Sequence, residues 1–163
     1  MSALPIVLRA VTKDDINALA LVMGQAIAAR DKASWSPLAN VVFMRIIWDE
    51  LMQLDTWSQL ALVNGQVAGF VLGSAKLDQQ GQTTDTEKLE FLMIAPQYWG
   101  KGIGSLLLNW AKEGHHARGV RYIELLVQEN NQRACALYER HGFTRIAQLQ
   151  MEREALVKYQ LTL

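Results

Sequence analysis

The sequence is poor in the residues that cross-link a chain or fix its backbone. It contains one cysteine, Cys135, and three prolines among 163 residues. A single cysteine excludes an intramolecular disulfide and fits a reducing interior, so we expect a cytoplasmic protein. Alanines flank Cys135 on both sides, and we therefore interpret it as a small buried apolar residue rather than as a thiol nucleophile.

An excess of charge of either sign is also lacking. Sixteen Lys and Arg residues balance sixteen Asp and Glu residues, and the formal net charge is zero. No global field then attracts nucleic acid or an anionic membrane. No apolar run approaches the ~20 residues of a membrane span, and no basic segment leads into an apolar core near residue 1. We expect a soluble, unexported protein with no nucleic-acid or membrane partner.

Patterns that hold metal ions are missing as well. The three histidines are His115, His116 and His141, and each lies near the end of a predicted helix. An imidazole at a helix C-terminus commonly interacts with the helix dipole. Because no Cys, His and carboxylate spacing resembles a metal site, we expect no metal.

Hydrophobic periodicity and turn residues predict one domain covering residues 1–163. Asn64-Gly65 is the strongest hairpin signal, and the polar stretch 78–85 is expected to be a loop. The order of elements indicates an α/β fold built on a mixed sheet of about seven strands. The expected strands are 4–11, 57–63, 66–77, 89–95, 120–128, 143–151 and 155–161, and the expected helices are about 12–29, 41–54, 101–118 and 130–141.

Three glycines on alternate positions follow a predicted strand and open a predicted helix: Gly100, Gly102 and Gly104. A helix start presents unpaired N–H groups to anions, and glycines leave that backbone accessible. The segment therefore predicts a phosphate-binding loop. It is not a dinucleotide fingerprint, because Ser105 stands where Gly-x-Gly-x-x-Gly requires its third glycine. It is not a nucleotide-triphosphate loop either, because no Gly-x-x-x-x-Gly-Lys-Ser/Thr string occurs in the chain. These failures argue against an NAD-dependent oxidoreductase.

Residues 131–143 read Asn-Gln-Arg-Ala-Cys-Ala-Leu-Tyr-Glu-Arg-His-Gly-Phe. This segment resembles the Asn-x-x-Ala-x-x-Leu-Tyr-x-x-x-Gly-Phe segment of the GNAT family of N-acetyltransferases at every named position. The glycine stretch resembles the same family's Gln/Arg-x-x-Gly-x-Gly/Ala acyl-CoA loop, with Gly102 and Gly104 matching. Trp99 departs from the pattern, since it stands in the Gln/Arg position. The implied fold is a mixed, mostly antiparallel sheet of about seven strands flanked by about four helices.

The resemblance implies an acetyl-CoA-dependent N-acetyltransferase that moves an acetyl group directly to a primary amine within a ternary complex. A non-catalytic acyl-CoA-binding or sensor module of the same fold is the alternative. The acceptor stays open: a polyamine, an amino acid, a drug, or a protein N-terminus or lysine would each fit. The oligomeric state is open too, a homodimer included.

Cofactor contacts follow from the resemblance. In the family, the strands before the glycine loop and after its helix diverge, and the pantetheine arm of the acyl donor lies between them. Because Trp99 lacks the usual charge or amide, binding of the diphosphate would rest on backbone N–H groups, with Lys101 as a further contact. The expected contact residues are Met93, Ile94, Trp99, Gly100, Lys101, Gly102, Ile103, Gly104, Asn131 and Tyr138.

Tyr138 is the expected proton donor to the leaving thiolate, since an ordinary phenol is protonated at neutral pH. Packing in the core is its alternative role. Glu90 is the expected base for the amine, directly or through water, and partial burial would raise its pKa toward a useful value. Glu87, Asp85 or water could replace it.

Fewer residues in the sequence indicate where the amine acceptor binds. Trp35 lies in a loop flanked by Ser and Pro, and we expect it to line this pocket. Four acidic residues near the glycine loop favour a cationic acceptor; they are Asp78, Asp85, Glu87 and Glu90.

Overall fold

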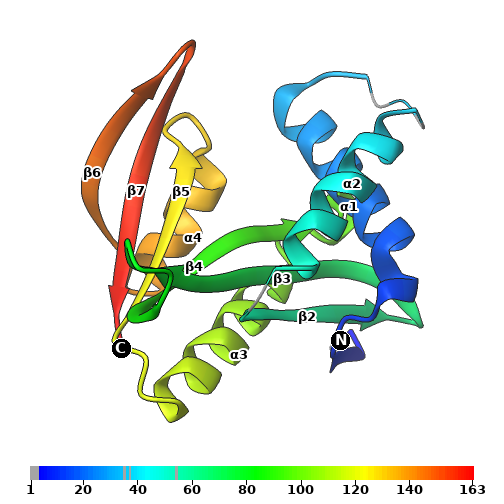
Figure 1. Ribbon diagram of the computed structural model, residues 1–163. Coiled ribbons are helices and arrows are strands. Elements are labelled where there is room, and N and C mark those ends of the chain that lie inside the picture. Colours follow the sequence, from blue (N-terminus) through cyan, green and yellow to red (C-terminus); the bar gives the residue numbers. More distant parts are fainter. Residues whose placement is uncertain (1–3, 35, 37, 54) are drawn as a thin grey trace.

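A computed structural model describes the chain except for residues 1–3, 35, 37 and 54. Its described part contains a seven-stranded sheet in the order β1-β2-β3-β4-β5-β7-β6 (Figure 1). The strands are β1 (Ile6–Arg9), β2 (Thr56–Val63), β3 (Gln66–Leu77), β4 (Thr83–Ile94), β5 (Tyr122–Gln128), β6 (Thr144–Met151) and β7 (Glu154–Thr162), and the helices are α1 (Ile16–Asp31), α2 (Ala39–Leu51), α3 (Ile103–Ala117) and α4 (Gln132–Arg140).

The sheet is mixed and mostly antiparallel, as the sequence predicted. Among the described strands, β4 and β5 alone pair in parallel, and the other neighbouring strands pair antiparallel. The parallel pair follows from the α3 crossover, since parallel strands need a long connection between them. β2 and β3 join at Asn64-Gly65, where both residues have positive φ, which confirms the predicted hairpin turn.

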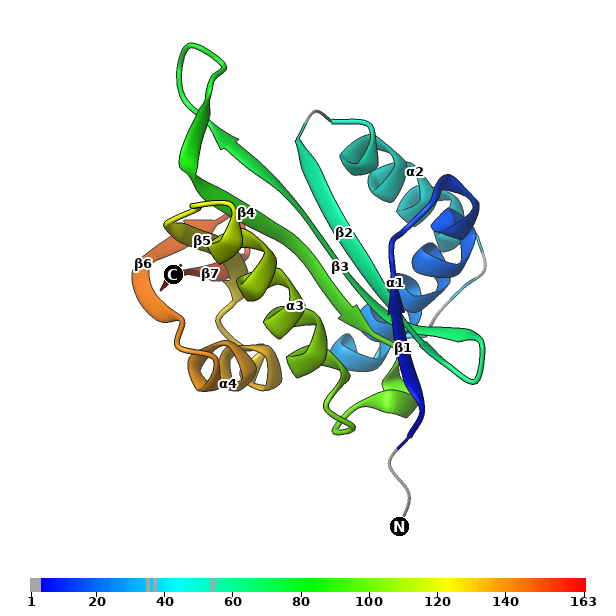
Figure 2. The same cartoon turned by 90° about the horizontal axis from the view of Figure 1, so that it is seen from below.

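Helices cover both faces of the sheet, and two hydrophobic cores result. Successive side chains of a strand point to opposite faces, so Leu60 packs under α1 and α2 whereas Ala61 packs under α3. Figure 2 shows strands β2 to β4 running between the two helix pairs. The strand β3 is buried from Ala68 to Ala75, which explains its nearly continuous run of small and apolar residues.

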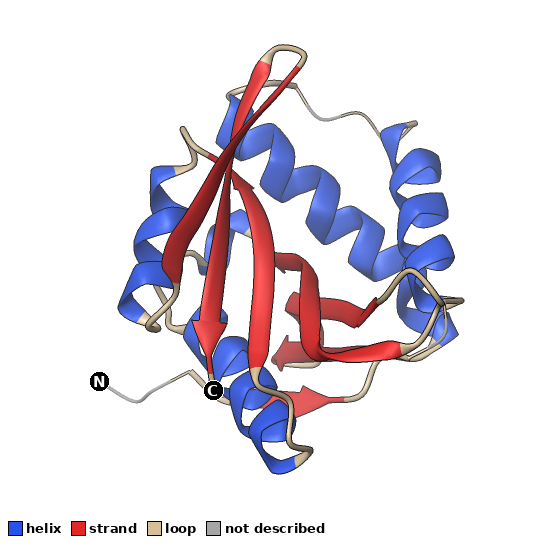
Figure 3. Ribbon diagram, turned by 60° about the vertical axis from the view of Figure 1, so that its left-hand side comes forward, coloured by secondary structure: helices blue, strands red, loops and turns tan. Residues whose placement is uncertain are grey.

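The parallel pair β4–β5 is short. Pairing covers Thr86 to Lys88 on β4 and Tyr122 to Glu124 on β5. Beyond these residues β4 continues to Ile94 and β5 to Gln128, and the two strands diverge. Figure 3 shows the consequence, because β5, β7 and β6 stand at a steep angle to the other strands. The divergence that the family resemblance implied is therefore present, and it opens the sheet next to the glycine loop.

Several predicted boundaries were wrong. β1 covers Ile6–Arg9 rather than 4–11, and α2 ends at Leu51 rather than at 54. β4 begins at Thr83 rather than near Leu89, because Thr83 pairs with Leu77 of β3. Residues 78–82 form the predicted loop, but from Thr83 onward the polar composition is overridden by backbone pairing with the end of β3. α3 begins at Ile103 rather than at Lys101, since Gly102 has φ of 83° and cannot be helical.

Within the described ranges, no helix has the length and apolar character needed to cross a membrane. No cluster of His, Cys, Asp and Glu suited to a metal ion occurs among these residues either.

Candidate active site

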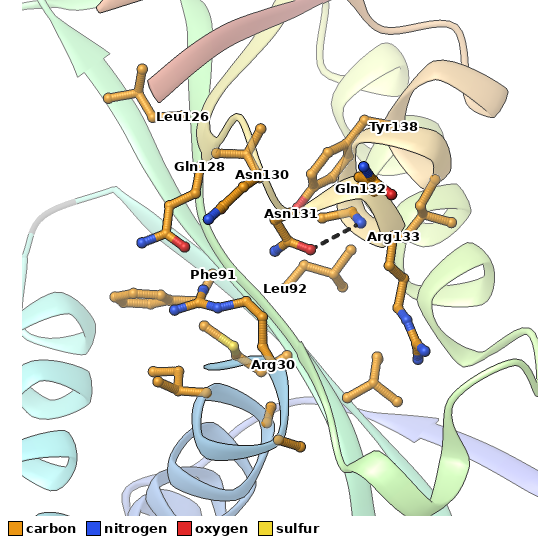
Figure 4. A pocket seen from close by; sticks show the side chains of 18 of the residues that line it. Arg30, Phe91, Leu92, Leu126, Gln128, Asn130, Asn131, Gln132, Arg133 and Tyr138 are labelled. Atoms are coloured by element: carbon orange, nitrogen blue, oxygen red, sulfur yellow. Dashed lines mark hydrogen bonds between the residues drawn. The ribbon is translucent and has the colours of Figure 1, made fainter. Parts of the chain in front are cut away.

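A cavity of about 500 Å³ opens where β4 and β5 diverge. Its walls come from the last turn of α1, the end of β4, the end of β5 and the first turns of α4 (Figure 4). The fold thus brings together segments that are far apart in the sequence. The cavity is lined by six of the predicted site residues, which are Glu90, Met93, Ile94, Trp99, Asn131 and Tyr138.

The free edge of β4 supplies backbone donors to this cavity. The Ala95 N–H donates to the Ala68 carbonyl of β3 at 2.8 Å. Backbone groups alternate between the two edges of a strand, so the N–H groups of Ile94 and Leu92 face the gap toward β5, whereas that of Met93 faces β3. Met93 contributes its side chain to the cavity. Leu92 was not anticipated, because the alternation is known only once the pairing with β3 is known.

The glycine loop has the backbone that an anion-binding turn needs. Gly100 and Gly102 have φ of 74° and 83°, a region that favours glycine. A Cβ atom at either position would meet no atom within 4 Å, so the space before the loop is open. These two residues leave room and backbone freedom for a phosphate group.

Gly104 has another role. A Cβ atom there would lie 3.1 Å from Cδ2 of Leu137, so this glycine permits the close approach of α3 to α4. Ile103 is 1% exposed and packs in the core, which leaves its backbone as the part able to contact a ligand. Lys101 is exposed in the loop, two residues before α3 begins.

Trp99 is held at both its edge and its face. Its indole N–H donates to the Ile94 carbonyl at 2.8 Å. The Arg133 guanidinium lies over the indole ring, with its central carbon 3.9 Å from the ring centroid. Trp99 therefore connects the end of β4 to the first turn of α4. Sequence reasoning missed Arg133, although it stands inside the matched segment 131–143.

Tyr138 combines packing in the core with a place in the cavity wall. It is 6% exposed, and its ring meets that of Phe143 edge-on at 5.5 Å. It also lines the cavity. Burial raises the pKa of its phenol well above the ordinary value, so the hydroxyl stays protonated and able to donate.

Asn131 caps α4, because its Oδ1 accepts from the Ala134 N–H at 3.3 Å (Figure 4). The remainder of its side chain lines the cavity, where the amide N–H₂ is a donor.

Glu90 is the extra residue of a β-bulge. Leu72 pairs with Phe91 and Gly73 with Leu89, so β4 has one residue more than β3 at this point. Such bulges redirect side chains and are frequent beside active sites. The Glu90 carboxylate forms an ion pair with Lys88 at 3.1 Å. The nearby Glu50 of α2 was not anticipated, and burial together with the Glu90 charge raises its pKa.

The remaining acidic residues do not gather at the cavity. Glu87 accepts from the Trp57 indole N–H at 3.2 Å, and burial raises its pKa. The Asp85 carboxylate lies 3.7 Å from the Arg121 guanidinium. The Asp78 carboxylate accepts hydrogen bonds from backbone N–H groups within its own turn. The expected four-residue acidic cluster is therefore wrong, because alternation and the bulge send its members to different places. Trp35 lies outside the described residues.

The side of the cavity next to α1 was not predicted. Arg30, at the end of α1, lines it and forms an ion pair with Asp31 at 2.8 Å. Phe91, Leu126 and Leu156 add apolar surface. Nothing in the local sequence marks these residues, since they approach one another only through the tertiary fold.

Comparison with solved structures identifies the class of fold. The Escherichia coli ribosomal-protein-S18-alanine N-acetyltransferase is similar in structure, with a TM-score of 0.77 and 21% identity over 97% of this chain and 94% of that one. The PaiA N-acetyltransferase of Thermoplasma acidophilum, solved with coenzyme A, has a TM-score of 0.75 and 18% identity over 94% and 98% of the two chains. The fold is that of the acyl-CoA N-acyltransferases.

Comparison of the sequence identifies the family. Residues 26–143 match the acetyltransferase (GNAT) family, and the chain belongs to that family. An uncharacterised N-acetyltransferase of Methanocaldococcus jannaschii is 29% identical over 83% of this chain, and the mycothiol acetyltransferase of Beutenbergia cavernae is 38% identical over 57% of it. The chain spans 59% and 32% of the lengths of these two relatives.

Proposed function

We propose that the protein is an acetyl-CoA-dependent N-acetyltransferase that transfers the acetyl group directly to a primary amine in a ternary complex. The observation that carries this proposal is the cavity between β4 and β5, which has a protonated, buried phenol on one wall and a bulged carboxylate on another. The glycine loop is open at the end where the donor's phosphates would lie.

The reaction joins the amine nitrogen to the thioester carbonyl carbon and breaks the carbon–sulfur bond. The Ile94 N–H, on the free edge of β4, stabilises the negative charge that develops on the carbonyl oxygen. Glu90, directly or through water, takes the proton that the amine must lose. Tyr138 gives its hydroxyl proton to the leaving thiolate, and the products are an N-acetyl amine and CoA.

The cavity also suggests how the two substrates are separated. The acyl donor occupies the end near Trp99 and Asn131. The amine enters from the wall that Arg30, Phe91 and Leu126 line. Direct transfer requires this arrangement, because both substrates must be bound before the bond to nitrogen forms.

The test is incubation of the purified protein with acetyl-CoA and a panel of polyamines, amino acids, amine drugs and peptides while free thiol is measured. Amine-dependent thiol release is expected for at least one class. Tight binding of acetyl-CoA without amine-dependent release across the panel would favour the non-catalytic acyl-CoA-binding module instead.

A further inference from the structure

The glycine loop of this chain lacks the Gln or Arg that the GNAT acyl-CoA pattern has ahead of its glycines. Trp99 occupies that position, and its only polar group already donates to the Ile94 carbonyl. A diphosphate carries two negative charges, and backbone N–H groups supply only partial positive charge. A cationic side chain near the loop would therefore strengthen binding substantially.

Arg133 lies where such a side chain is needed. It is four residues before Leu137 on α4, so the two share one face of the helix. Leu137 is also the residue that a Cβ atom at Gly104 would touch, at 3.1 Å. Arg133 is therefore one helical turn along the face that packs against the start of α3, and it lines the cavity. Figure 4 shows it extending from α4, across the cavity from Arg30.

The stacking on Trp99 fixes the plane of the Arg133 guanidinium. A guanidinium that lies on an aromatic face keeps its N–H groups at its rim free to donate sideways, in the fork that matches phosphate oxygens. None of the ion pairs among the described residues involves Arg133, and its side chain is exposed. The positive charge is thus not neutralised by a carboxylate of the described fold. The corresponding arginine on the other wall, Arg30, is paired with Asp31.

We infer that Arg133, held on the Trp99 indole, binds a phosphate group of the acyl-CoA donor and replaces the Gln or Arg that is absent from position 99. This inference rests on the proposed function. This positive charge comes from α4 and adds to that of Lys101 in the loop, and Trp99 orients the guanidinium instead of binding phosphate itself.

The experiment measures dissociation constants by titration calorimetry for acetyl-CoA, for acetyl-dephospho-CoA and for S-acetylpantetheine. The variants are Arg133→Gln, Trp99→Phe and Trp99→Leu, with Arg140→Gln as the matched control, since Arg140 is an exposed arginine at the other end of the same helix. Each titration is repeated at low and at high salt.

Arg133→Gln should weaken acetyl-CoA binding about tenfold and reduce its salt dependence, while S-acetylpantetheine binding stays unchanged. An equal loss with acetyl-dephospho-CoA assigns the contact to the diphosphate, and a loss seen only with acetyl-CoA assigns it to the 3′-phosphate. Trp99→Phe keeps a flat face and should retain most of the affinity, whereas Trp99→Leu should lose it.

Three results would overturn the inference: unchanged acetyl-CoA affinity in Arg133→Gln, an equal loss for S-acetylpantetheine, or an equal loss in Arg140→Gln. Wild-type protein that binds no acetyl-CoA would instead refute the proposed function itself. The two failures are therefore distinguishable.

Discussion

At the scale of single residues, burial changes the pKa of side chains at this site. Tyr138 is the clearest example, since burial keeps its phenol protonated while one edge reaches the cavity. Replacing Tyr138 by Phe removes the hydroxyl and keeps the edge-on contact with Phe143. We expect kcat to fall by about 10²-fold, with little change in the acetyl-CoA dissociation constant, because the donated proton matters mainly in the transition state. Steady-state kinetics with calorimetric binding tests this, and wild-type turnover would assign Tyr138 to packing alone.

The two carboxylates Glu90 and Glu87 provide a matched pair. Glu90 lines the cavity, whereas Glu87 is held by the Trp57 indole away from its lining. Glu90→Gln should lower kcat/KM by about 10²-fold and remove the acidic limb of the pH–rate profile, where the base becomes protonated. Glu87→Gln should leave both unchanged. A normal acidic limb in Glu90→Gln would move the base to water or to Glu50.

At the scale of secondary structure elements, the glycine loop and its neighbours determine what can bind. Gly102→Val places a side chain in the open space before the loop. Wild-type protein at a hundred times the dissociation constant of acetyl-CoA should gain about 2.7 kcal/mol of stability, and Gly102→Val should gain none. Thermal denaturation with and without acetyl-CoA measures this difference.

Gly81→Val is the control for that loop variant. Gly81 has φ of 77° and open space around it, so valine strains the backbone there as it does at Gly102. Gly81 lies in the turn before β4, outside the cavity lining. Both variants should lose a similar amount of intrinsic stability, about 1–2 kcal/mol, yet only Gly102→Val should lose the response to acetyl-CoA. A full response in Gly102→Val would refute the phosphate-loop assignment.

The packing of β3 against β4 depends on another glycine. A Cβ atom at Gly73 would overlap the Trp57 ring and the Lys88 carbonyl oxygen. Gly73→Ala should therefore destabilise the protein by about 2–3 kcal/mol, because the backbone of β4 cannot move away freely. Gly114→Ala, in α3 with no atom near the new methyl group, should stabilise the protein by up to about 1 kcal/mol. Urea denaturation distinguishes the two, and equal stability would contradict this view of the strand pair.

At the scale of the whole molecule, the core on the α3 side contains an imidazole. His115 is 1% exposed, meets the Trp57 ring at 4.4 Å, and has an Nε2 atom without a hydrogen-bond partner in the described structure. Burial lowers its pKa below 6.5, so the folded state keeps this ring neutral.

The pH dependence of stability follows from this ring. Below pH 6.5 the unfolded chain binds a proton at His115 that the folded chain does not. The contribution of His115 to the free energy of unfolding is therefore fully present above that pH and is lost as the pH drops. The contribution of His115 approaches about 1.4 kcal/mol per pH unit. His115→Leu should flatten the decline between pH 6.5 and 5 in urea denaturation. His141, whose pKa is also lowered by burial, is retained in both proteins and cancels. An unchanged slope would show that His115 is protonated in the folded state.

What the sequence determined by itself is local. The Asn64-Gly65 turn, the positive-φ glycines Gly100 and Gly102, and the Asn131 cap depend on backbone preferences of a few adjacent residues, and such preferences are readable in order along the chain. The family segment at 131–143 is also a short pattern, and the family match confirms it. Hydrophobic periodicity located the helices and most strands for the same reason.

Tertiary structure decided which of these residues meet. Pairing with β3 decides the length of β4, the bulge at Glu90 and the direction of the Ile94 N–H. The register of that pairing cannot be read from either strand alone. The same pairing directs Glu87 to Trp57, so the acidic residues that lie close together in the sequence do not form a cluster in the fold. Arg133 reaches Trp99 because α4 packs against the start of α3. These contacts depend on long-range packing, and packing is a property of the whole fold rather than of any segment.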